Sequence, residues 1–382
     1  MRKSAIIINT SLYDTGVSTY IKSILFSIKN DDRFIVLARD NSWKLFLNGN
    51  YYFKLQTVNY YLPYFYKLLI FMNCKNFGQW FFEKFDPLGH YLKSSKINFC
   101  LFPTPCYLTF LVEGAACVSI HDLMHITERR FDESSSFFKT IYRNNLYKNI
   151  GNVFNKIIFE SKYGYKMYLD NYKLNRNTQT FIVPYSCPNS IIEIIERKLF
   201  LEFNTKMYGD YLFYPASFWK HKNHKNLLFA FLNVIKKGHD IKLVFSGGLN
   251  KEYKHIKELV VNLGLEKNIF FTGYVNETEI VALYFGAKAL IMPTFFGPTN
   301  IPPIEAIYCN TPVLISDIYG MKEQLQDSAL YFDPNSILDI ERVLLNFFKS
   351  DIDKLIENGK KLKSKFSPKN FNISLINALD AN

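Results

Sequence analysis

The sequence predicts an α/β protein made of two doubly wound, Rossmann-like domains that face each other across a cleft. Short apolar segments alternate with amphipathic helical segments through both halves of the chain, as in parallel sheets covered by helices. The length of 382 residues suits two domains and a small extension. Hydrophobic residues make up 48% and charged residues 21%, which is enough apolar material for two cores and excludes global disorder.

The C-terminal half shows this alternation most clearly. Asn276, with Glu279 three residues later, is typical of a capping box that opens a helix running through Ala287. Gly247-Gly248 and Gly264 interrupt the apolar pattern where a strand and a helix are expected to end. Strands are expected at 211–213, 241–245, 269–271, 289–292, 312–315 and 329–332.

The N-terminal half follows the same pattern less regularly. Residues 43–95 are rich in aromatic residues and lysine and fit no single element. Strands are expected at 4–9, 33–38, 97–102, 116–121, 156–160 and 180–183. A linker is expected from Pro184 to about Asp210, which gives domains at 1–185 and 186–365 and a tail at 366–382 that packs back on the first domain.

Charge is distributed unevenly between the halves. Residues 1–190 carry 23 Lys and Arg against 13 Asp and Glu, whereas residues 191–382 carry 23 against 21. The excess of positive charge favours an anionic partner, for which a membrane surface, a lipid phosphate and nucleic acid are the candidates. No recognisable nucleic-acid-binding module is present, so nucleic acid is the least favoured partner.

Cysteine usage and hydropathy indicate a reduced, cytoplasmic protein. The six cysteines form no C-x-x-C pair and have no histidine at zinc-binding spacing, which predicts free thiols. The apolar run at residues 5–8 is too short for a signal peptide and suits a buried first strand. Because no run of about 18 apolar residues exists, we expect no membrane span.

The most informative motif runs from Pro293 to Ala306. A buried strand ends, a loop rich in Gly, Pro and Asn follows, and Pro302-Pro303 opens a helix where missing N–H groups cost nothing. Free amides at Thr299, Asn300 and Ile301 would suit a diphosphate, and Glu305 in the first turn could accept hydrogen bonds from a ribose diol. The alternative is an ordinary strand-loop-helix in which Glu305 is a surface acid that compensates the helix dipole.

Two further strand ends carry basic or polar residues. Lys222 follows the strand at 211–213, where a cation can neutralise charge on a departing diphosphate, although a solvated basic helix start is the alternative. His121-Asp122 follows the strand at 116–121, a position at which polar residues are common whatever their role.

Glycines after two strands give weaker signals. Gly16 follows the first strand. A glycine there either allows a phosphate or an acceptor to approach the backbone or forms a tight turn, and both interpretations stay open. Gly248, in the pair Gly247-Gly248, suits a wall of the nucleotide cleft.

These motifs together resemble the retaining glycosyltransferases of family 4, the group 1 glycosyltransferases of the GT-B fold. Ile301 to Ala306 (I-P-P-I-E-A) and Thr311 to Leu314 (T-P-V-L) resemble the family's P-P-L-E-A loop and its T-P-V-I strand. The resemblance continues through Phe271 to Val275 and through Ala329 to Pro334. It covers the C-terminal half continuously and the N-terminal half by scattered motifs.

Two positions depart from the family pattern. The first glutamate of the family's E-x7-E pair falls at Gly297, so only Glu305 is kept, and this puts the identity of the donor sugar in doubt. The family's arginine near Lys222 falls at Ser217, for which Lys220 or His221 could compensate. The Gly-Pro-Thr-Asn variant resembles a subgroup of surface-polysaccharide enzymes.

The resemblance implies transfer of a hexose such as mannose, glucose or rhamnose from a UDP-, GDP- or dTDP-sugar to a saccharide or polyprenyl-diphosphate-linked acceptor, with retention and without a metal, in O-antigen, capsule or similar assembly. It implies catalytic roles for Lys222, His121 and Asp122, the last of which could orient His121 or bind the acceptor. It implies a donor site formed by Glu305, Ile301, Asn300, Thr299, Gly297, Ser217, Gly248, Val275 and Gly16. A nucleotide-sugar epimerase or hydrolase, or a non-catalytic basic protein that binds membranes or nucleic acid, remain alternatives.

Two other segments have competing interpretations. Asp351-Ile352-Asp353 has the D-x-D form of metal-dependent transferases, but its position between helical segments predicts a helix start. Residues 51–96 mix aromatic and aliphatic residues with lysines, which suits either a surface in the lipid headgroup layer or a core helix with a solvated face. The segment includes Lys54, Tyr60, Tyr61, Leu62, Tyr64, Phe65, Lys67, Leu68, Leu69, Ile70, Phe71, Lys75 and Lys84. The first interpretation predicts peripheral attachment to the inner face of the cytoplasmic membrane.

Overall fold

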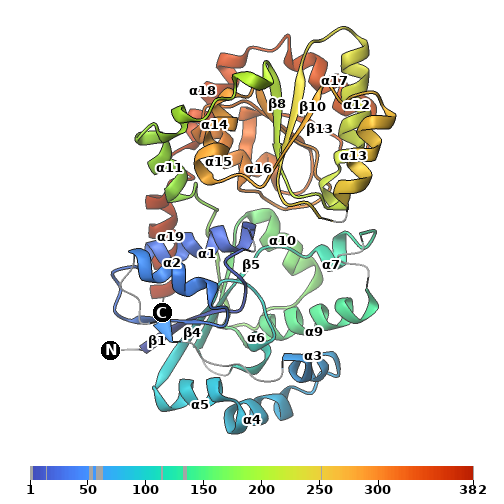
Figure 1. Ribbon diagram of the computed structural model, residues 1–382. Helices are drawn as coiled ribbons and strands as arrows, with labels where there is room; N and C mark the ends of the chain where they lie inside the picture. The colour runs from blue at the N-terminus through green and yellow to red at the C-terminus, as the bar shows by residue number, and fades with distance from the viewer. Residues whose placement is uncertain are drawn as a thin grey trace. The chain divides into compact units, whose positions relative to one another are not determined.

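The computed structural model describes residues 3–13, 15–50, 55–56, 63–112, 115–131, 136–250 and 252–381. The chain divides into two compact units, of which unit 1 comprises Met1–Tyr185 with Pro368–Asn382 and unit 2 comprises Ser186–Ser367 (Figure 1). Each unit has a parallel sheet flanked by helices, so the predicted fold class of two Rossmann-like domains is confirmed. The cleft between the domains stays a prediction.

The sheet of unit 1 has, in the described residues, seven parallel strands in the order β3-β2-β1-β4-β5-β6-β7. Every strand predicted for this unit is present, with ends within two residues of those expected, and β3 is an additional short strand. The strands are β1 (Lys3–Ile8), β2 (Phe34–Ala38), β3 (Leu55–Gln56), β4 (Ile97–Phe102), β5 (Ala115–Ile120), β6 (Lys156–Phe159) and β7 (Gln179–Ile182).

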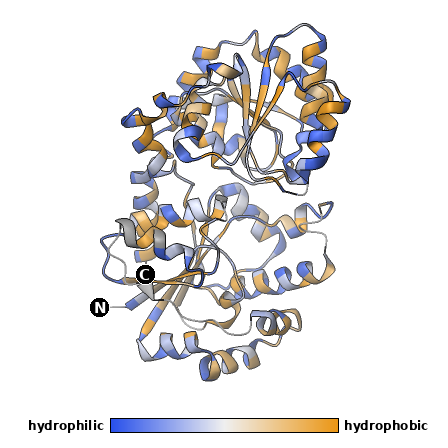
Figure 2. Ribbon diagram, viewed as in Figure 1, coloured by the Kyte–Doolittle hydropathy of each residue, from blue (hydrophilic) through white to orange (hydrophobic). Residues whose placement is uncertain are grey.

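Two apolar cores cover the two faces of this sheet. Successive strand residues point to opposite faces, so Ile6 and Ile8 of β1 join one core while Ala5 and Ile7 join the other. Apolar residues follow the strands of both sheets in Figure 2. The helices of unit 1 are α1 (Thr15–Ser27), α2 (Ser42–Asn50), α3 (Pro63–Phe71), α4 (Lys75–Phe85), α5 (Pro87–Ser94), α6 (Leu108–Leu111), α7 (Met124–Thr127), α9 (Phe137–Val153), α10 (Lys162–Asn171) and α19 (Pro368–Asp380).

The sheet of unit 2 has, in the described residues, six parallel strands in the order β10-β9-β8-β11-β12-β13. These are β8 (Tyr211–Pro215), β9 (Lys242–Ser246), β10 (Ile269–Gly273), β11 (Ala289–Met292), β12 (Val313–Ser316) and β13 (Ala329–Phe332), again within two residues of the predicted ends. The order reverses direction between β8 and β11. Such a switch point is where doubly wound sheets bind their ligands.

The helices of unit 2 include one that the sequence did not predict. The expected linker from Pro184 to about Asp210 is wrong over most of its length, because α11 (Asn189–Glu196) buries Ile191 and Ile194 against this unit. The others are α12 (His224–Lys236), α13 (Glu252–Asn262), α14 (Glu277–Gly286), α15 (Pro302–Tyr308), α16 (Met321–Leu325), α17 (Ile337–Phe347) and α18 (Ile352–Leu362), with short 3-10 turns η1 (Leu199–Glu202), η2 (Lys206–Tyr208), η3 (Lys220–Lys222) and η4 (Gln326–Ser328).

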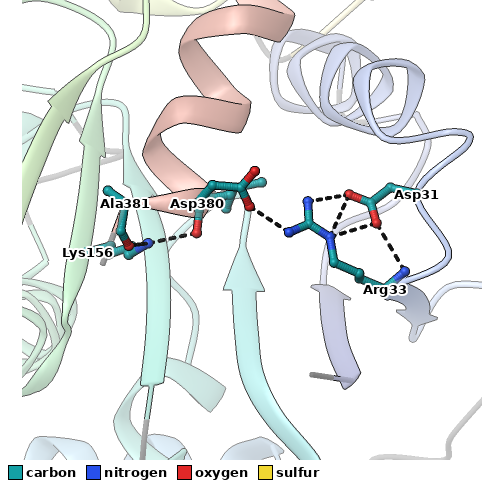
Figure 3. A network of polar contacts seen from close by, with 6 residues as sticks. Asp31, Arg33, Lys156, Asp380 and Ala381 are labelled. Atoms are coloured by element: carbon teal, nitrogen blue, oxygen red, sulfur yellow. Dashed lines mark hydrogen bonds and ion pairs between the residues drawn. The ribbon is translucent and has the colours of Figure 1, made fainter. Parts of the chain in front are cut away.

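Helix α19 returns to unit 1 and is fixed there by polar contacts at its end (Figure 3). The Lys156 ammonium of β6 donates to the carbonyls of Leu379 at 2.7 Å and Ala381 at 2.5 Å. Arg33 forms an ion pair of 2.6 Å with Asp380. A cation at a helix C-terminus also complements the helix dipole. The contacts therefore hold α19 beside α1, against which it packs.

Three smaller expectations can be compared with the structure. All six cysteines are free thiols. Asp351 caps α18 by accepting a hydrogen bond from the Lys354 amide at 3.0 Å, so the predicted helix start is confirmed. Among the helices of the described residues, none combines the length and apolar character needed to cross a bilayer.

Candidate active site

The carboxyl ends of β8 and β11 bring the two main motifs of unit 2 together. The loop after β8 carries Ser217 and Lys222, and the loop after β11 carries residues 297–301 and leads into α15. The Asn223 amide donates to the carbonyls of Pro293 at 2.9 Å and Pro334 at 2.8 Å, and the Phe295 N–H donates to the His221 carbonyl at 2.8 Å. These contacts join the two loops into one surface at the switch point.

Lys222 lies at the end of the turn η3 and is half-buried. Its carbonyl accepts a hydrogen bond of 2.8 Å from Tyr214, which fixes the backbone. In the described part of the chain, no hydrogen bond or ion pair involves its ammonium group, and burial lowers its pKa to about 8. A desolvated cation without a counterion is suited to binding an anion.

Of the two residues proposed to replace the family's arginine, His221 does not supply a second positive charge. Burial and the neighbouring Lys222 charge lower the pKa of His221 to about 3, so this ring is neutral at pH 7 and the expectation for His221 is wrong. Lys220 is exposed on the same turn. Ser217 instead accepts a hydrogen bond of 3.3 Å from the Gly248 amide.

Gly247 and Gly248 allow the loop after β9 to lie against the loop after β8. Gly247 has φ +151°, and a Cβ there would lie 2.6 Å from the Ala216 carbonyl carbon. The Phe218 amide donates to the Gly248 carbonyl at 3.3 Å. Val275, which follows β10, is half-buried directly before the Asn276 cap of α14. Gly248 thus lies beside the loop after β8, at the switch-point surface. Val275 follows β10, which is separated from β8 by β9.

Glu305 lies in the first turn of α15 and is fixed by a buried tyrosine. The Tyr284 hydroxyl of α14 donates to Oε2 at 2.8 Å, and Tyr284 is fully buried. Burial raises the pKa of Glu305 to about 7, although the bond from Tyr284 acts in the opposite direction. Within the described residues, Oε1 has no hydrogen-bond partner, so one oxygen of the carboxylate is available to a ligand.

The loop before α15 explains why a glycine replaces the family's first glutamate. Gly297 has φ +123°, which an L-residue adopts only with strain, and a Cβ there would lie 2.7 Å from Nδ2 of Asn300. The Asn300 side chain therefore lies directly beside Gly297. A side chain at position 297 would therefore strain the backbone and require the Asn300 side chain to move.

Gln324 of α16 holds the same loop through both backbone groups of Asn300. The Asn300 amide donates to Oε1 of Gln324 at 3.0 Å, and Nε2 of Gln324 donates to the Asn300 carbonyl at 2.6 Å. The expectation of a free amide at Asn300 is therefore wrong, because a buried side chain already satisfies it. In the described structure, the buried hydroxyl of Thr299 has no partner, and the backbone amides of Thr299 and Ile301 donate no hydrogen bond.

His121 of unit 1 has both ring nitrogens occupied. Nε2 lies 2.8 Å from the Pro103 carbonyl and Nδ1 lies 2.9 Å from the Tyr185 hydroxyl. Because a carbonyl only accepts, Nε2 carries the proton and Nδ1 accepts from Tyr185. Burial also lowers the pKa of His121. The ring is therefore held neutral, an arrangement suited to positioning rather than proton transfer.

Asp122 and Gly16 take different places from those expected. Asp122 accepts a hydrogen bond of 2.9 Å from the Met124 amide at the start of α7, and both His121 nitrogens bond to Tyr185 and Pro103, so Asp122 does not orient His121 through a hydrogen bond. Gly16 lies in the exposed first turn of α1, not in a tight turn, and a Cβ there would meet open space. The fold itself does not require glycine at this position.

In the described part of residues 51–96, some apolar residues are buried and others are exposed, and the membrane-surface alternative stays a prediction. Helix α3 buries Tyr66, Leu69 and Ile70, whereas Lys54, Tyr60, Tyr61 and Leu62 lie outside the described residues. An aromatic face remains, defined by eight residues that are each at least 50% exposed: Tyr64, Leu68, Met72, Phe77, Trp80, Phe85, Phe137 and Phe138. Lys84 lies over the Trp80 ring at 5.5 Å and Lys67 over the Tyr64 ring at the same distance.

Sequence reasoning missed the residues that position the predicted ones. Tyr284, Gln324 and Tyr185 contact Glu305, Asn300 and His121, yet each lies 21 to 64 residues away in the sequence. No local motif marks them.

Among the described residues, no group of three or more His, Cys, Asp or Glu is arranged to hold a metal ion.

Comparison with known proteins agrees with this geometry. Residues 197–362 match the family model described as glycosyl transferases group 1. The O-antigen chain mannosyltransferase RfbU of Salmonella typhimurium is 33% identical over 33% of this chain and 35% of the relative. The O-antigen chain mannosyltransferase B of Escherichia coli is 28% identical over 44% of this chain and 45% of the relative. The matched segments thus span less than half the length of either relative.

Solved structures share the whole fold at low identity. Anabaena Alr3699/HepE in complex with UDP and glucose aligns with a TM-score of 0.74 and 14% identity over 100% of both chains. WaaG, a glycosyltransferase involved in lipopolysaccharide biosynthesis, aligns with a TM-score of 0.67 and 13% identity over 99% of this chain and 100% of that chain. At such identities the likeness concerns the fold alone.

Proposed function

Because residues 197–362 match the family model of the group 1 glycosyl transferases, we propose that this chain transfers a sugar from a nucleotide-sugar to a hydroxyl group with retention at the anomeric carbon. The observation that carries the proposal is the edge of unit 2. There a half-buried lysine without a counterion and a carboxylate with one unpartnered oxygen follow the two strands of the switch point. Because both named relatives are mannosyltransferases, mannose is the proposed sugar.

In the proposed reaction, the bond between the anomeric carbon and the diphosphate oxygen breaks while the acceptor oxygen forms a bond on the same face. The acceptor proton passes to the departing phosphate. Lys222 offsets the charge that develops on this diphosphate, in the role that other transferases give to a metal ion. Glu305 accepts hydrogen bonds from the ribose diol through Oε1, while Tyr284 holds Oε2. Gln324 supports the loop whose Thr299 and Ile301 amides can donate to phosphate.

Calorimetry and product analysis test this proposal. The full chain is titrated with GDP-mannose, UDP-glucose and dTDP-rhamnose, and each is then incubated with and without a saccharide acceptor. We expect saturable binding of one donor and, only when acceptor is present, formation of a product that keeps the anomeric configuration of that donor. Free or epimerised sugar formed from donor alone would indicate a hydrolase or epimerase instead. No donor binding at millimolar concentration would contradict any nucleotide-sugar function.

We also propose that the acceptor is linked to a lipid and that unit 1 attaches to the inner face of an anionic membrane. The aromatic face of unit 1 combines rings that suit the headgroup layer with the lysines Lys67 and Lys84 beside them. Each lysine near anionic lipid contributes about 1 kcal/mol, screened by salt. Sedimentation should therefore show binding to anionic vesicles that falls with salt and is weak for neutral vesicles.

Matched substitutions distinguish this attachment from nonspecific hydrophobic binding to vesicles. Trp80→Ser with Phe138→Ser should weaken vesicle binding, and Lys67→Glu with Lys84→Glu should weaken it further. Leu338→Ser, which removes an apolar residue that is 74% exposed in unit 2, is the control and should have no effect. Equal binding by all variants, or equal binding to neutral and anionic vesicles, would exclude the aromatic face as the attachment surface.

A further inference from the structure

The side chain of Asn300 lies in the loop between β11 and α15, and the two atoms of its amide have different surroundings. Nδ2 donates a weak hydrogen bond of 3.8 Å to the sulfur of Met321. Oδ1 has no hydrogen-bond partner among the described residues, yet it is not a buried atom, so a ligand can reach it. Asn300 therefore presents an open hydrogen-bond acceptor at the sheet edge of unit 2.

The position of this amide is fixed from two sides. Gln324, which is 3% exposed, bonds to the N–H of Asn300 at 3.0 Å and to its carbonyl at 2.6 Å, so the backbone that carries the side chain is held. A Cβ at Gly297 would lie 2.7 Å from Nδ2 and 2.9 Å from Oδ1, so the amide fills the space where a side chain of residue 297 would begin. An acceptor that is held in place before the ligand arrives loses little entropy on binding.

The chemistry of Oδ1 limits what it can bind. An amide oxygen only accepts hydrogen bonds, and an ionised diphosphate has no proton to donate, so Oδ1 requires a ligand group with an O–H or N–H. The side chain carries no charge, and it therefore does not repel a neighbouring phosphate as a carboxylate would. A sugar hydroxyl meets both conditions, because it donates a hydrogen bond and is neutral.

Neighbouring groups of the same loop indicate which sugar is meant. The N–H groups of Thr299 and Ile301 flank Asn300, donate no hydrogen bond within the described structure and are proposed to bind the diphosphate. Glu305, in the first turn of α15, is proposed to bind the ribose diol. A nucleotide-sugar carries its ribose on one side of the diphosphate and the transferred sugar on the other. With the ribose assigned to Glu305, the transferred sugar is the partner left for the acceptor that lies between the two amides.

We propose that Oδ1 of Asn300 accepts a hydrogen bond from a hydroxyl group of the transferred sugar and thereby selects the donor. This inference rests on the proposed glycosyl transfer, because it requires a nucleotide-sugar at this edge. A donor that lacks the hydroxyl, or holds it in the opposite configuration, leaves Oδ1 without a partner in the complex and binds less tightly. Asn300 is thus a specificity-determining residue and takes no part in the bond changes.

Calorimetry on the full chain compares each donor with its own nucleotide: GDP-mannose with GDP, UDP-glucose with UDP and dTDP-rhamnose with dTDP. The ratio of the two dissociation constants isolates the contribution of the transferred sugar. For the donor that binds, Asn300→Ala should weaken nucleotide-sugar binding about 3- to 10-fold and leave binding of the nucleotide unchanged. Glu305→Gln, in contrast, should weaken both. Asn262→Ala, at an exposed position on α13, is the matched control and should change neither.

Gly297→Ala gives an independent measurement, because its Cβ would displace the Asn300 amide. It should reduce the contribution of the sugar about as much as Asn300→Ala does, and the double variant should show no further loss of that contribution. Deoxy analogues of the bound donor identify the hydroxyl. Removal of the hydroxyl that Oδ1 binds should weaken binding to the wild type by the same factor as Asn300→Ala, and should not weaken binding to the Asn300→Ala protein. Thermal melts verify folding.

The outcomes separate this inference from the proposed reaction. Equal weakening of nucleotide and nucleotide-sugar binding by Asn300→Ala, or no weakening of either, would overturn the role of Asn300 even if sugar transfer is observed. Equal losses for every deoxy analogue in the wild type and in Asn300→Ala would likewise overturn it. A chain that binds none of the three donors would instead refute the proposed function, and the inference with it.

Discussion

The strand ends around Lys222 and Glu305 in unit 2 and those around His121 in unit 1 handle polar groups in different ways. In unit 2, Lys222 has no counterion and Glu305 keeps one oxygen without a partner among the described residues. In unit 1, both nitrogens of His121 are bonded, and the Tyr20 hydroxyl lies 2.8 Å from Oγ of Ser119. Both units have the same doubly wound architecture, so the difference lies in the side chains and not in the fold.

This difference suggests different roles for the two sets of strand ends in the proposed reaction. Unpartnered charges at a sheet edge lower the stability of the free protein and are compensated when a ligand binds. Groups that already bond to each other instead fix a shape. The polar groups of unit 2 therefore suit the proposed binding of a charged nucleotide. Those around His121 in unit 1 instead hold one another in place.

Lys222→Ala should produce the largest effect, because it removes a half-buried cation that has no counterion among the described residues. Charge builds on the leaving diphosphate during the reaction, so we expect kcat to fall about 100- to 1,000-fold with a smaller change in donor affinity. With a pKa of about 8, the lysine loses its proton above that pH, and wild-type turnover should decline there. Initial rates and donor titrations across pH measure both effects.

The control for Lys222 is Lys225→Ala, which removes an exposed lysine from the start of α12 and should leave turnover unchanged. A change in KM alone for Lys222→Ala would show that this lysine binds the donor without favouring the transition state.

Glu305→Gln should weaken donor binding about 10- to 100-fold, because an amide accepts hydrogen bonds from a ribose diol less strongly than a carboxylate. Wild-type affinity should decline as pH falls through about 7, where Glu305 becomes protonated, and the variant should lack this dependence. Calorimetry at pH 6 and pH 8 measures the difference. Identical pH dependence in the two proteins would show that another group controls binding.

The same substitution should stabilise the protein without ligand. Because burial raises the pKa of Glu305, the folded state favours the protonated form. The stability that this preference adds is fully present below pH 4.5 and is lost as pH rises through about 7. At pH 8 we expect Glu305→Gln to unfold with a free energy about 1–3 kcal/mol higher than wild type. Glu258→Gln, at an exposed position on α13, is the control.

Gln324→Leu tests whether donor binding at the sheet edge of unit 2 depends on the two hydrogen bonds between Gln324 and Asn300. Loss of both hydrogen bonds to Asn300 should loosen the loop at 297–301 and raise the donor KM about 5- to 10-fold, with little change in kcat. Gln324→Glu keeps an acceptor for the Asn300 amide but places an oxygen against its carbonyl, so it should not restore KM. Unchanged KM in Gln324→Leu would mean that the loop holds its shape unaided.

Tyr185→Phe should give the smallest effect. It tests whether the hydrogen bond from Tyr185 only positions the His121 ring in unit 1. The substitution frees Nδ1 of His121 while leaving the bond from Nε2 to Pro103. If the ring only positions other groups, kcat/KM should fall about two- to fivefold and the pH profile should keep its shape. An additional ionisation near pH 6 to 7 in the kcat/KM profile of the variant would show that His121 takes part in proton transfer.

The sequence predicted the strands, the capping box of Asn276 and the position of Glu305, because these depend on residues within a few positions of each other. It could not predict that Gln324 occupies the Asn300 amide, or that Tyr185 and not Asp122 holds His121, because these contacts join residues far apart in the chain. Helix α11 was missed because the break in the alternating pattern after Pro184 suggested a linker, whereas burial of Ile191 and Ile194 stabilises a helix there. The consequence of a glycine at 297 became clear only from its φ angle.

The return of α19 to unit 1 affects the order in which the protein can fold. Unit 2 is continuous in sequence and complete once residue 367 has been made, whereas unit 1 lacks Phe371, Leu375 and Leu379 of its core until the last helix has been synthesised. At about 5–20 residues per second, roughly 10–40 s pass between residue 185 and residue 368. During this time the apolar surface that α19 covers stays open. The unit whose synthesis begins first is therefore the one that completes folding last.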